Sequence, residues 1–314
     1  MKLLIFGAGA LGSLLGFHLS KSCEVHLVAR GENLRALQEH GLKVVRPEGE
    51  VQIRLPAHGA PPEEKFHLVL LTVKSYQTEE ALPYLKGLLE EGIPILSLQN
   101  GLDNERKIAG FIEREGLPAG VLGGITSCGA TMISPGVVAE GGLGRTVVGI
   151  YHRDEQASAE RVGKEFVRKM REASLEARWS EDIRKELWMK SVVNSAINPL
   201  TALLKVQNGY ILSHPPLLSV VKDVVEEGCK AADAAGVQLN QIELEREVLR
   251  VLEETSSNRS STLQDIERGR QTEVDSYLGE MIRVAEEEGE DLRVLKVLYQ
   301  LVKALEAENS SLSL

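Results

Sequence analysis

Cysteine and long apolar stretches are scarce in this sequence. Its 314 residues include three cysteines, Cys23, Cys128 and Cys229, which lie far apart. So few thiols give neither a disulfide framework nor a CxxC pair, which is typical of reduced thiols in a cytoplasmic protein. No apolar stretch reaches the ~18 residues that a transmembrane helix needs, and the histidines lack the HxH or HxxxH spacing of a zinc site. We therefore expect a cytoplasmic protein with no membrane span and no metal.

Basic residues are also in deficit. Lysine and arginine number 36 against 46 aspartate and glutamate residues, which gives a formal net charge of −10. A chain this acidic is a poor candidate for general binding to nucleic acid or to an anionic membrane. An anionic ligand must be held by a few placed basic groups or by helix N-termini, so the expected partner is a small molecule.

Short apolar strands alternate with helices over the first half of the chain. Strands are expected at residues 3–6, 24–28, 68–73, 93–98 and, partly antiparallel, at 121–131, 136–140 and 146–150, with a hairpin at 44–55 and helices at 11–19, 33–39 and 78–91. Such β-α-β alternation is typical of a parallel sheet that carries helices on both faces.

The second half shows helical spacing throughout. Helices are expected at residues 181–198, 216–235, 242–254, 261–287 and 292–306, the first ending before Pro199. The predicted fold class is therefore α/β: an N-terminal Rossmann-type doubly wound sheet with an all-helical C-terminal domain. We place the boundary near Ser180, which gives a first domain at 1–179 and a helical second domain at 180–314. The apolar helix faces fit a homodimer interface or a monomer core.

A GxGxxG loop follows the first strand and opens the first helix. It comprises Gly7, Ala8, Gly9, Ala10, Leu11 and Gly12. The first glycine permits the tight turn, the second lets the backbone approach a pyrophosphate, and the third allows close helix–strand packing. The helix N-terminus adds unpaired N–H groups. This context favours a dinucleotide over a turn without a ligand.

Arg30 follows the second strand at the position that separates the two nicotinamide cofactors. An NAD site usually has an acidic residue there, about 20 residues after the glycines, to bind the ribose 2′-hydroxyl. A guanidinium can instead bind a 2′-phosphate through two hydrogen bonds. Arg30 therefore predicts NADP(H), with an exposed surface arginine as the alternative.

The helix expected at 181–198 carries an unusual polar stripe. Lys190, Asn194 and Asn198 lie at i, i+4 and i+8, on one face and among apolar neighbours. A lysine beside two amides could donate a proton and orient a small polar ligand, whereas a solvated polar face is the alternative. Further along, Glu273 could bind substrate, although an ordinary surface carboxylate is favoured for it and for Asp265 by composition alone.

These blocks together make the sequence resemble the ketopantoate reductase (2-dehydropantoate 2-reductase) family over nearly its whole length. The resemblance rests on their order and spacing: GAGALG, TVK ending at Lys74, QNG around Asn100, ELWxK ending at Lys190, NxxxNPLT from Asn194, SSTLQD, and TEVD. It implies reduction of 2-dehydropantoate to (R)-pantoate with NADPH, on the route to pantothenate and coenzyme A. It also implies an NADP(H)-binding Rossmann domain at 1–179, a helical substrate and catalytic domain at 180–314, and a substrate site in the cleft between them.

The resemblance also implies a role for each matched residue. Lys190 matches the catalytic lysine that protonates the carbonyl oxygen, and Glu273 the acid that binds the substrate hydroxyl. The other matched positions are substrate-binding Asn194, Asn198, Asn258, Ser261 and Asn100, and cofactor-binding Gly7–Gly12, Arg30, Lys74, Asn100 and Asp265.

One stretch departs from the family pattern, and two other functions stay open. Related enzymes often have Thr-Thr-x-His where this chain has the segment around Cys128, which places that thiol near the cleft or leaves it an inert strand cysteine.

The first rival function is that of another NADP-dependent 2-keto acid or opine-type dehydrogenase. The second is a non-catalytic NADPH sensor, against which the lysine–asparagine stripe argues.

Overall fold

Strand β1 (Lys2–Phe6) has side chains that alternate between two cores. In the computed structural model, which describes residues 1–152 and 158–311, Leu3 and Ile5 pack with the apolar faces of α1 (Ala10–Leu19) and α5 (Ser158–Glu172). Leu4 and Phe6 pack on the opposite face with helices α3 (Thr78–Glu90) and α4 (Asn104–Glu115). Because successive strand residues point to opposite faces, an unbroken apolar run is what a strand covered on both sides requires.

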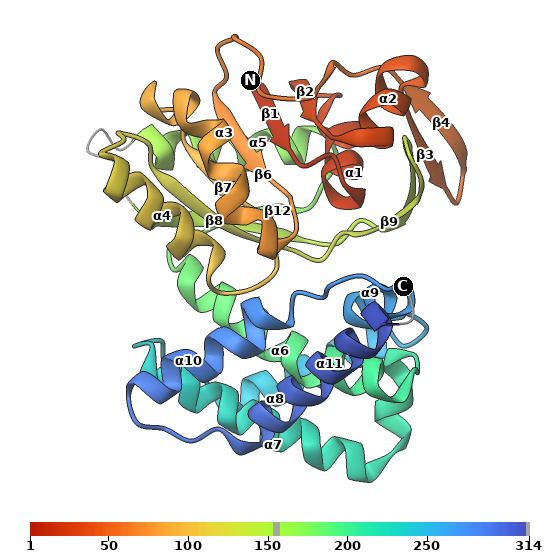
Figure 1. Cartoon of the computed structure of the whole chain (residues 1–314), viewed down its shortest axis with the longest axis vertical. Helices are drawn as coiled ribbons and strands as arrows, with labels where there is room; N and C mark the ends of the chain where they lie inside the picture. The colour runs from red at the N-terminus through yellow and green to blue at the C-terminus, as the bar shows by residue number, and fades with distance from the viewer. Residues whose placement is uncertain (153–157, 312–314) are drawn as a thin grey trace. The chain divides into compact units, whose positions relative to one another are not determined.

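The strand belongs to an eight-stranded sheet within the described residues. Its order is β12-β11-β8-β7-β6-β1-β2-β5, and the neighbours are parallel except β8 and β11, which pair antiparallel. The other strands are β2 (Glu24–Val28), β5 (Ala57–His58), β6 (Leu68–Leu71), β7 (Ile95–Ser97), β8 (Val121–Thr126), β11 (Thr146–His152) and β12 (Ala177–Ser180). Figure 1 labels β1, β2, β6, β7, β8 and β12. The predicted doubly wound sheet is confirmed.

A smaller sheet of four strands lies in the same part of the described chain. It contains β3 (Leu42–Arg46), β4 (Gly49–Ile53), β9 (Gly129–Ser134) and β10 (Val137–Gly142), in the order β4-β3-β10-β9. The antiparallel pairing of β3 with β4 confirms the predicted hairpin. The prediction of one strand over 121–131 is wrong, because the chain leaves the large sheet after β8 and enters the small one at β9.

Helices cover the large sheet and lead to the second half of the chain. The remaining ones beside the sheet are α2 (Gly31–His40), η1 (Ser75–Gln77), α3 (Thr78–Glu90) and α4 (Asn104–Glu115). After residue 183 the described chain has helices and connections only: α6 (Ile183–Leu204), η2 (Asn208–Ser213), α7 (Pro215–Ala234), α8 (Gln241–Glu254), α9 (Ser261–Glu267), η3 (Asp275–Gly279), α10 (Glu280–Glu287) and α11 (Arg293–Ser311). The all-helical second half is thus confirmed. None of these described helices is both long and apolar enough to span a membrane.

The chain divides into two compact units whose limits do not follow sequence order throughout. The first consists of Met1–Gln99 and Asn104–Ile183, and the second of Asn100–Asp103 and Arg184–Leu314. The division after Ile183 falls close to the predicted boundary. The cofactor and substrate roles given to the two domains stay predictions.

Helix α6 continues past Pro199, so the predicted end before this residue is wrong. The Thr201 hydroxyl donates to the carbonyl oxygens of Ile197 and Asn198, at 3.0 Å each. Leu200 and Ala202 beyond the proline are buried. Burial of this apolar face outweighs the local cost of the missing N–H group.

The single helix predicted over 261–287 is also wrong. Helix α9 ends at Glu267, Gly269 adopts a φ of +62°, and the chain becomes helical again at Asp275 with one wide π-type turn. A left-handed glycine is a common way to end a helix, and π-turns are frequent at functional sites. The break leaves Glu273 outside any regular helix.

Candidate active site

The glycine loop adopts the geometry that its sequence predicts. Gly7 has a φ of +109°, and a Cβ on it would lie 2.7 Å from the backbone nitrogen of Val73. A Cβ on Gly12 would lie 2.5 Å from the hydroxyl oxygen of Thr72 and would overlap the Gly7 carbonyl. Only glycine fits at these two positions, because each packs directly against Thr72 or Val73, the residues that follow strand β6.

Gly9 faces open space at the start of α1. A Cβ there would meet no atom within 4 Å, and no side chain in the described part of the chain caps this helix. The first N–H groups of a helix have no partner within it and favour an anion, and no acidic residue stands in this first turn. The loop therefore fits a phosphate group.

A pocket of about 220 Å³ lies against this loop. It is lined by backbone and side chains of the glycine loop, the end of β2 and the start of α3, among them Gly7, Gly9, Arg30, Asn33, Gln77 and Glu80. Typical small-molecule sites enclose roughly 300–1,000 Å³, so the pocket fits part of a dinucleotide rather than a whole one. The residues present suit the phosphate and ribose end of such a ligand.

Arg30 lines this pocket and already has a partner of opposite charge. Its Nη1 lies 2.6 Å from Oε1 of Glu80, and its guanidinium carbon lies 5.3 Å from the centre of the Tyr84 ring. Both the arginine and the glutamate side chains are about half exposed. Sequence reasoning found the arginine and missed the glutamate, which is 50 residues away in the chain.

Lys74 and Asn33 stand at the edges of the same region. Lys74 directly precedes η1 and follows Val73, which lines the pocket. Asn33 was not predicted, yet its amide donates to the Ala8 carbonyl at 2.6 Å and accepts from the Gly136 N–H at 2.8 Å. It therefore fixes the glycine loop against α2.

Asn100 joins two predicted catalytic residues in the second unit. Its amide oxygen accepts a hydrogen bond from Lys190 Nζ at 2.9 Å, and its amide nitrogen donates to Glu273 Oε2 at 3.0 Å. Lys190 is half-buried and Glu273 is 7% exposed. The Asn100 amide thus holds a cation and a carboxylate on its two sides. This arrangement can present a proton donor and a hydrogen-bond acceptor to one small ligand.

The two other members of the polar stripe, Asn194 and Asn198, have side-chain amides without a hydrogen-bond partner among the described residues. Asn194 and Asn198 follow Lys190 by one and two turns of α6. Neither makes a side-chain hydrogen bond with any residue that the structure describes, although Asn198 is only 9% exposed. Because buried amides normally have partners, this face of α6 is suited to bind a polar ligand.

The short loop Asn100–Asp103 is fixed to the π-type turn at Asp275–Gly279. The Leu102 N–H donates to the Ser276 carbonyl at 2.8 Å, and the Ser276 hydroxyl contacts Asp103 and the Asn100 carbonyl. Gly101 has a φ of +114°, and a Cβ on it would overlap the Ser276 hydroxyl. The loop can lie this close only because residue 101 is glycine.

Helix α11 fixes the segment that carries Glu273. The Thr272 N–H and hydroxyl both donate to Glu306, and the Tyr299 hydroxyl donates to Asp275 at 2.7 Å. Glu273 is therefore held from both sides in the sequence, without belonging to a regular helix.

Ser261, Asn258 and Asp265 lie at or near the start of α9. Ser260 caps this helix, and its hydroxyl also accepts from Thr201, three residues after Asn198 on α6. Ser261 and Asn258 are exposed, and Asp265 is buried. The structure thus places Ser261 beside the end of the polar stripe.

Burial keeps one tyrosine of this region neutral. The Tyr277 hydroxyl lies 3.0 Å from that of Thr262 and so joins the π-type turn to α9. Burial raises the pKa of the Tyr277 phenol well above its ordinary value, with a smaller contribution from nearby carboxylates such as Glu273. The side chain acts as a neutral hydrogen-bonding group.

Cys128 lies in the turn between β8 and β9 rather than inside a strand. Its thiol is half-buried and donates to the Gly144 carbonyl at 3.4 Å. Burial raises the pKa of the other two thiols, Cys23 and Cys229. These two favour the unreactive thiol form near neutral pH.

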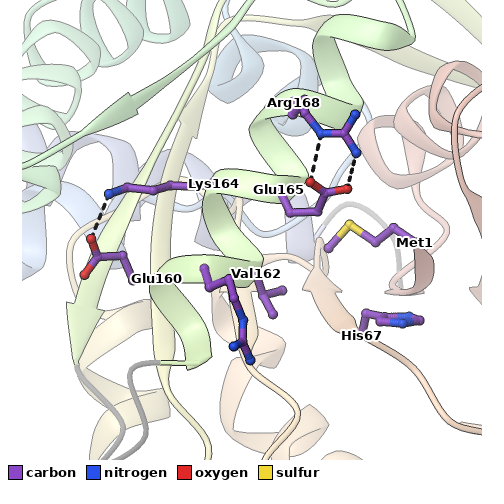
Figure 2. Close-up of a pocket in the computed structure, with 8 residues that line it drawn as sticks. Met1, His67, Glu160, Val162, Lys164, Glu165 and Arg168 are labelled. Carbon is purple, nitrogen blue, oxygen red and sulfur yellow. Dashed lines mark hydrogen bonds and ion pairs between the residues drawn. The ribbon is translucent and has the colours of Figure 1, made fainter.

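A wider hollow on the first unit has different chemistry. It encloses about 1,050 Å³ and is lined by Met1, His67 and one face of α5. Figure 2 shows that its charged groups already pair along the helix, Lys164 with Glu160 and Arg168 with Glu165. None of its lining residues belongs to the predicted site, so we do not assign the cofactor to it.

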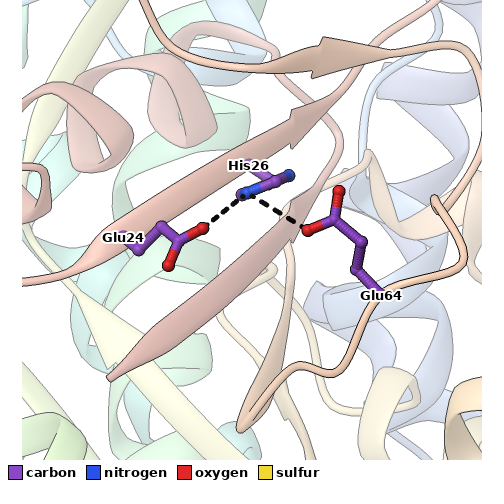
Figure 3. A group of neighbouring side chains, drawn as sticks. All are labelled: Glu24, His26 and Glu64. Atoms are coloured by element: carbon purple, nitrogen blue, oxygen red, sulfur yellow. Dashed lines mark hydrogen bonds and ion pairs between the residues drawn. The ribbon is translucent and has the colours of Figure 1, made fainter.

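Glu24, His26 and Glu64 form one group that could hold a metal ion among the described residues (Figure 3). Their ligand atoms lie within 4.8 Å of one another. The Lys2 ammonium contacts both carboxylates and lies 3.0 Å from Glu24. Because this cation already pairs with both acids, the cluster is explained as a surface ion-pair network.

Comparisons with known proteins match both halves of the chain. The family model described as Ketopantoate reductase PanE/ApbA matches residues 3–153, and the model described as Ketopantoate reductase PanE/ApbA C terminal matches residues 182–306. The 2-dehydropantoate 2-reductase of Pyrococcus horikoshii is 40% identical to this chain over 310 residues, which cover 98% of each protein.

Solved structures resemble the whole chain as well. A ternary structure of D-mandelate dehydrogenase with NADH and anilino(oxo)acetate has a TM-score of 0.90 at 28% identity, covering 99% of this chain and 100% of that one. A PanE/ApbA family ketopantoate reductase from Ralstonia eutropha has a TM-score of 0.86 at 29% identity, with the same coverage. With both halves matched by its models, the chain belongs to the ketopantoate reductase PanE/ApbA family.

Proposed function

We propose that this chain reduces 2-dehydropantoate to (R)-pantoate with NADPH, a step of pantothenate and coenzyme A biosynthesis. The observation that carries the proposal is the contact of Asn100 with both Lys190 and Glu273. The family and the 40% identity to a 2-dehydropantoate 2-reductase support the substrate.

Lys190 is the proton donor in this proposal. When bound, the nicotinamide would supply a hydride to the ketone carbon, and negative charge would then develop on the carbonyl oxygen. The Lys190 ammonium stabilises that charge and delivers the proton, and Asn100 holds its Nζ in place. The Glu273 carboxylate accepts a hydrogen bond from the substrate hydroxyl. The rest of the small molecule is bound by Asn194, Asn198, Asn258 and Ser261.

The cofactor would be held by the glycine loop and the residues beside it. Gly7–Gly12 would take the pyrophosphate and Arg30 the 2′-phosphate, as the open helix N-terminus and the pocket at Arg30 support. Lys74, Asn100 and Asp265 are proposed as further cofactor contacts on the family resemblance alone.

The direct test is NADPH oxidation by the purified protein with 2-dehydropantoate, beside the same assay with NADH. We expect turnover with NADPH. If neither NADPH nor NADH is oxidised, the proposed reaction is contradicted. A panel of other 2-keto acids belongs in the same experiment, because the D-mandelate dehydrogenase structure shares the fold at a TM-score of 0.90. Turnover of phenylglyoxylate but not 2-dehydropantoate would favour that second function.

Replacing Glu273 with alanine should mainly weaken substrate binding. Loss of a hydrogen bond to a charged group costs about 1.5–3 kcal/mol, so KM for the keto acid should rise roughly 10- to 100-fold. Steady-state kinetics measure this, with Glu288→Ala, an exposed acid after α10, as the control. An unchanged kcat/KM in Glu273→Ala would remove this residue from the site.

A further inference from the structure

Two side chains one turn apart on α3 hold the guanidinium of Arg30. Glu80 lies 2.6 Å from it, and Tyr84, four residues later, presents its ring at 5.3 Å. The Tyr84 ring in turn lies 6.4 Å from that of Phe6, at the end of β1. The arginine is therefore turned toward α3 by a carboxylate and an aromatic face together, rather than extended alone into solvent.

The carboxylate belongs to the pocket itself. Glu80, Arg30 and the glycine loop line the same cavity of about 220 Å³. A ligand group that reaches Arg30 therefore also meets the negative charge of Glu80. The pocket contains one group of each sign, where a site built only for a dianion would contain cations.

The two charges favour different cofactors. A guanidinium attracts a 2′-phosphate, whereas a carboxylate repels it and must give up its own contact with the arginine before the phosphate can bind. A 2′-hydroxyl carries no charge and can donate to a carboxylate, which is how acidic residues select NAD in this fold class. Glu80 therefore opposes the selection that Arg30 alone would make.

We propose that Glu80 is a specificity-determining residue that weakens the preference for the 2′-phosphate, so that the pocket takes NADH as well as NADPH. The proposal rests on the cofactor site assigned above and adds to it a residue and a second cofactor. It makes Arg30 and Glu80 a coupled pair, in which each changes the effect of removing the other.

Glu79 provides a matched control. It precedes Glu80 in the same first turn of α3, is also exposed, and does not line the pocket. Glu79→Gln removes the same charge from the same helix turn as Glu80→Gln. A difference between the two variants therefore reports on the pocket rather than on net charge or on the helix.

The test is equilibrium binding, measured by calorimetry on the full chain, of adenosine 2′,5′-bisphosphate and of 5′-AMP, which differ only in the 2′-phosphate. The wild type should bind the two with Kd values within about tenfold of each other. Glu80→Gln should tighten the bisphosphate by roughly 3- to 10-fold, the effect of one nearby charge, and leave 5′-AMP unchanged or weaker. Glu79→Gln should change neither by more than about twofold.

A second pair of variants separates this inference from the cofactor assignment. Arg30→Gln should weaken the bisphosphate by about tenfold or more, and Glu80→Gln should tighten it less in that background than in the wild type. An unchanged preference in Glu80→Gln, or a wild type that favours the bisphosphate by more than about tenfold, would overturn the role of Glu80 alone. If the wild type binds neither nucleotide, the cofactor site itself is wrong, and the inference falls with it.

Discussion

Lys190→Ala should lower kcat by at least about 10³-fold. The substitution removes both the proton donor and the positive charge beside the developing alkoxide. General acids typically contribute ~10²–10⁴-fold, and a preorganised donor at an oxyanion ~10²–10³-fold. Single-turnover kinetics with 2-dehydropantoate and reduced cofactor would measure the chemical step directly.

Lys185→Ala is the matched control for this variant, because Lys185 is an exposed lysine on the same helix. Its kcat should stay within about twofold of the wild type. Lys190→Arg keeps the charge but donates a proton far less readily, so it should recover only part of the loss. A decrease below tenfold in Lys190→Ala would remove this residue from the acid role.

Gly101→Ala should also have a large effect, although residue 101 carries no reacting group. Its φ of +114° disfavours any side chain, and the added Cβ would lie 2.6 Å from Ser276 Cβ and 2.8 Å from the Ser276 carbonyl oxygen. The loop must move, and Asn100 moves with it. A displacement of about 1 Å in a positioned group can cost ~10²-fold in rate, so we expect kcat to fall by about that factor.

Gly49→Ala separates backbone strain from this collision. Gly49 has a similar φ of +128°, but a Cβ there would meet no atom within 4 Å. Its activity should stay near that of the wild type, even if stability falls. The double variant Gly101→Ala with Ser276→Gly removes part of the collision and should recover part of kcat. Full activity in Gly101→Ala would show that the loop does not position Asn100.

The fold of the first unit could largely be predicted from local sequence patterns. The strand over 24–28 matches β2 at both ends, and the glycine loop has the turn that GxGxxG predicts. These elements are recognisable because an apolar run and a glycine requirement are properties of neighbouring residues. The helix expected to end before Pro199 shows the limit of such predictions. Leu200 and Ala202 are buried by contacts with distant parts of the chain, which the local sequence does not reveal.

The candidate site could be predicted as a set of residues but not as a set of contacts. Lys190 and Glu273 were found from a stripe and a motif, yet their common partner Asn100 lies 90 and 173 positions away from them. Glu80 gave no signal, because an acidic residue in the first turn of a helix is ordinary helix chemistry. Only the contact with Arg30, seen in the structure, indicates that Glu80 belongs to the pocket.

The assignment of Asn100–Asp103 to the second unit has a consequence for recombining members of this family. A chimera joined at residue 183 would inherit Lys190 and Glu273 from one parent and the loop that bridges them from the other. The four-residue loop and the Ser276 turn against which it fits must therefore be exchanged together, as one graft taken from two distant stretches of the gene. Parents that differ at either stretch would yield hybrids whose halves fold but whose proton donor is poorly held.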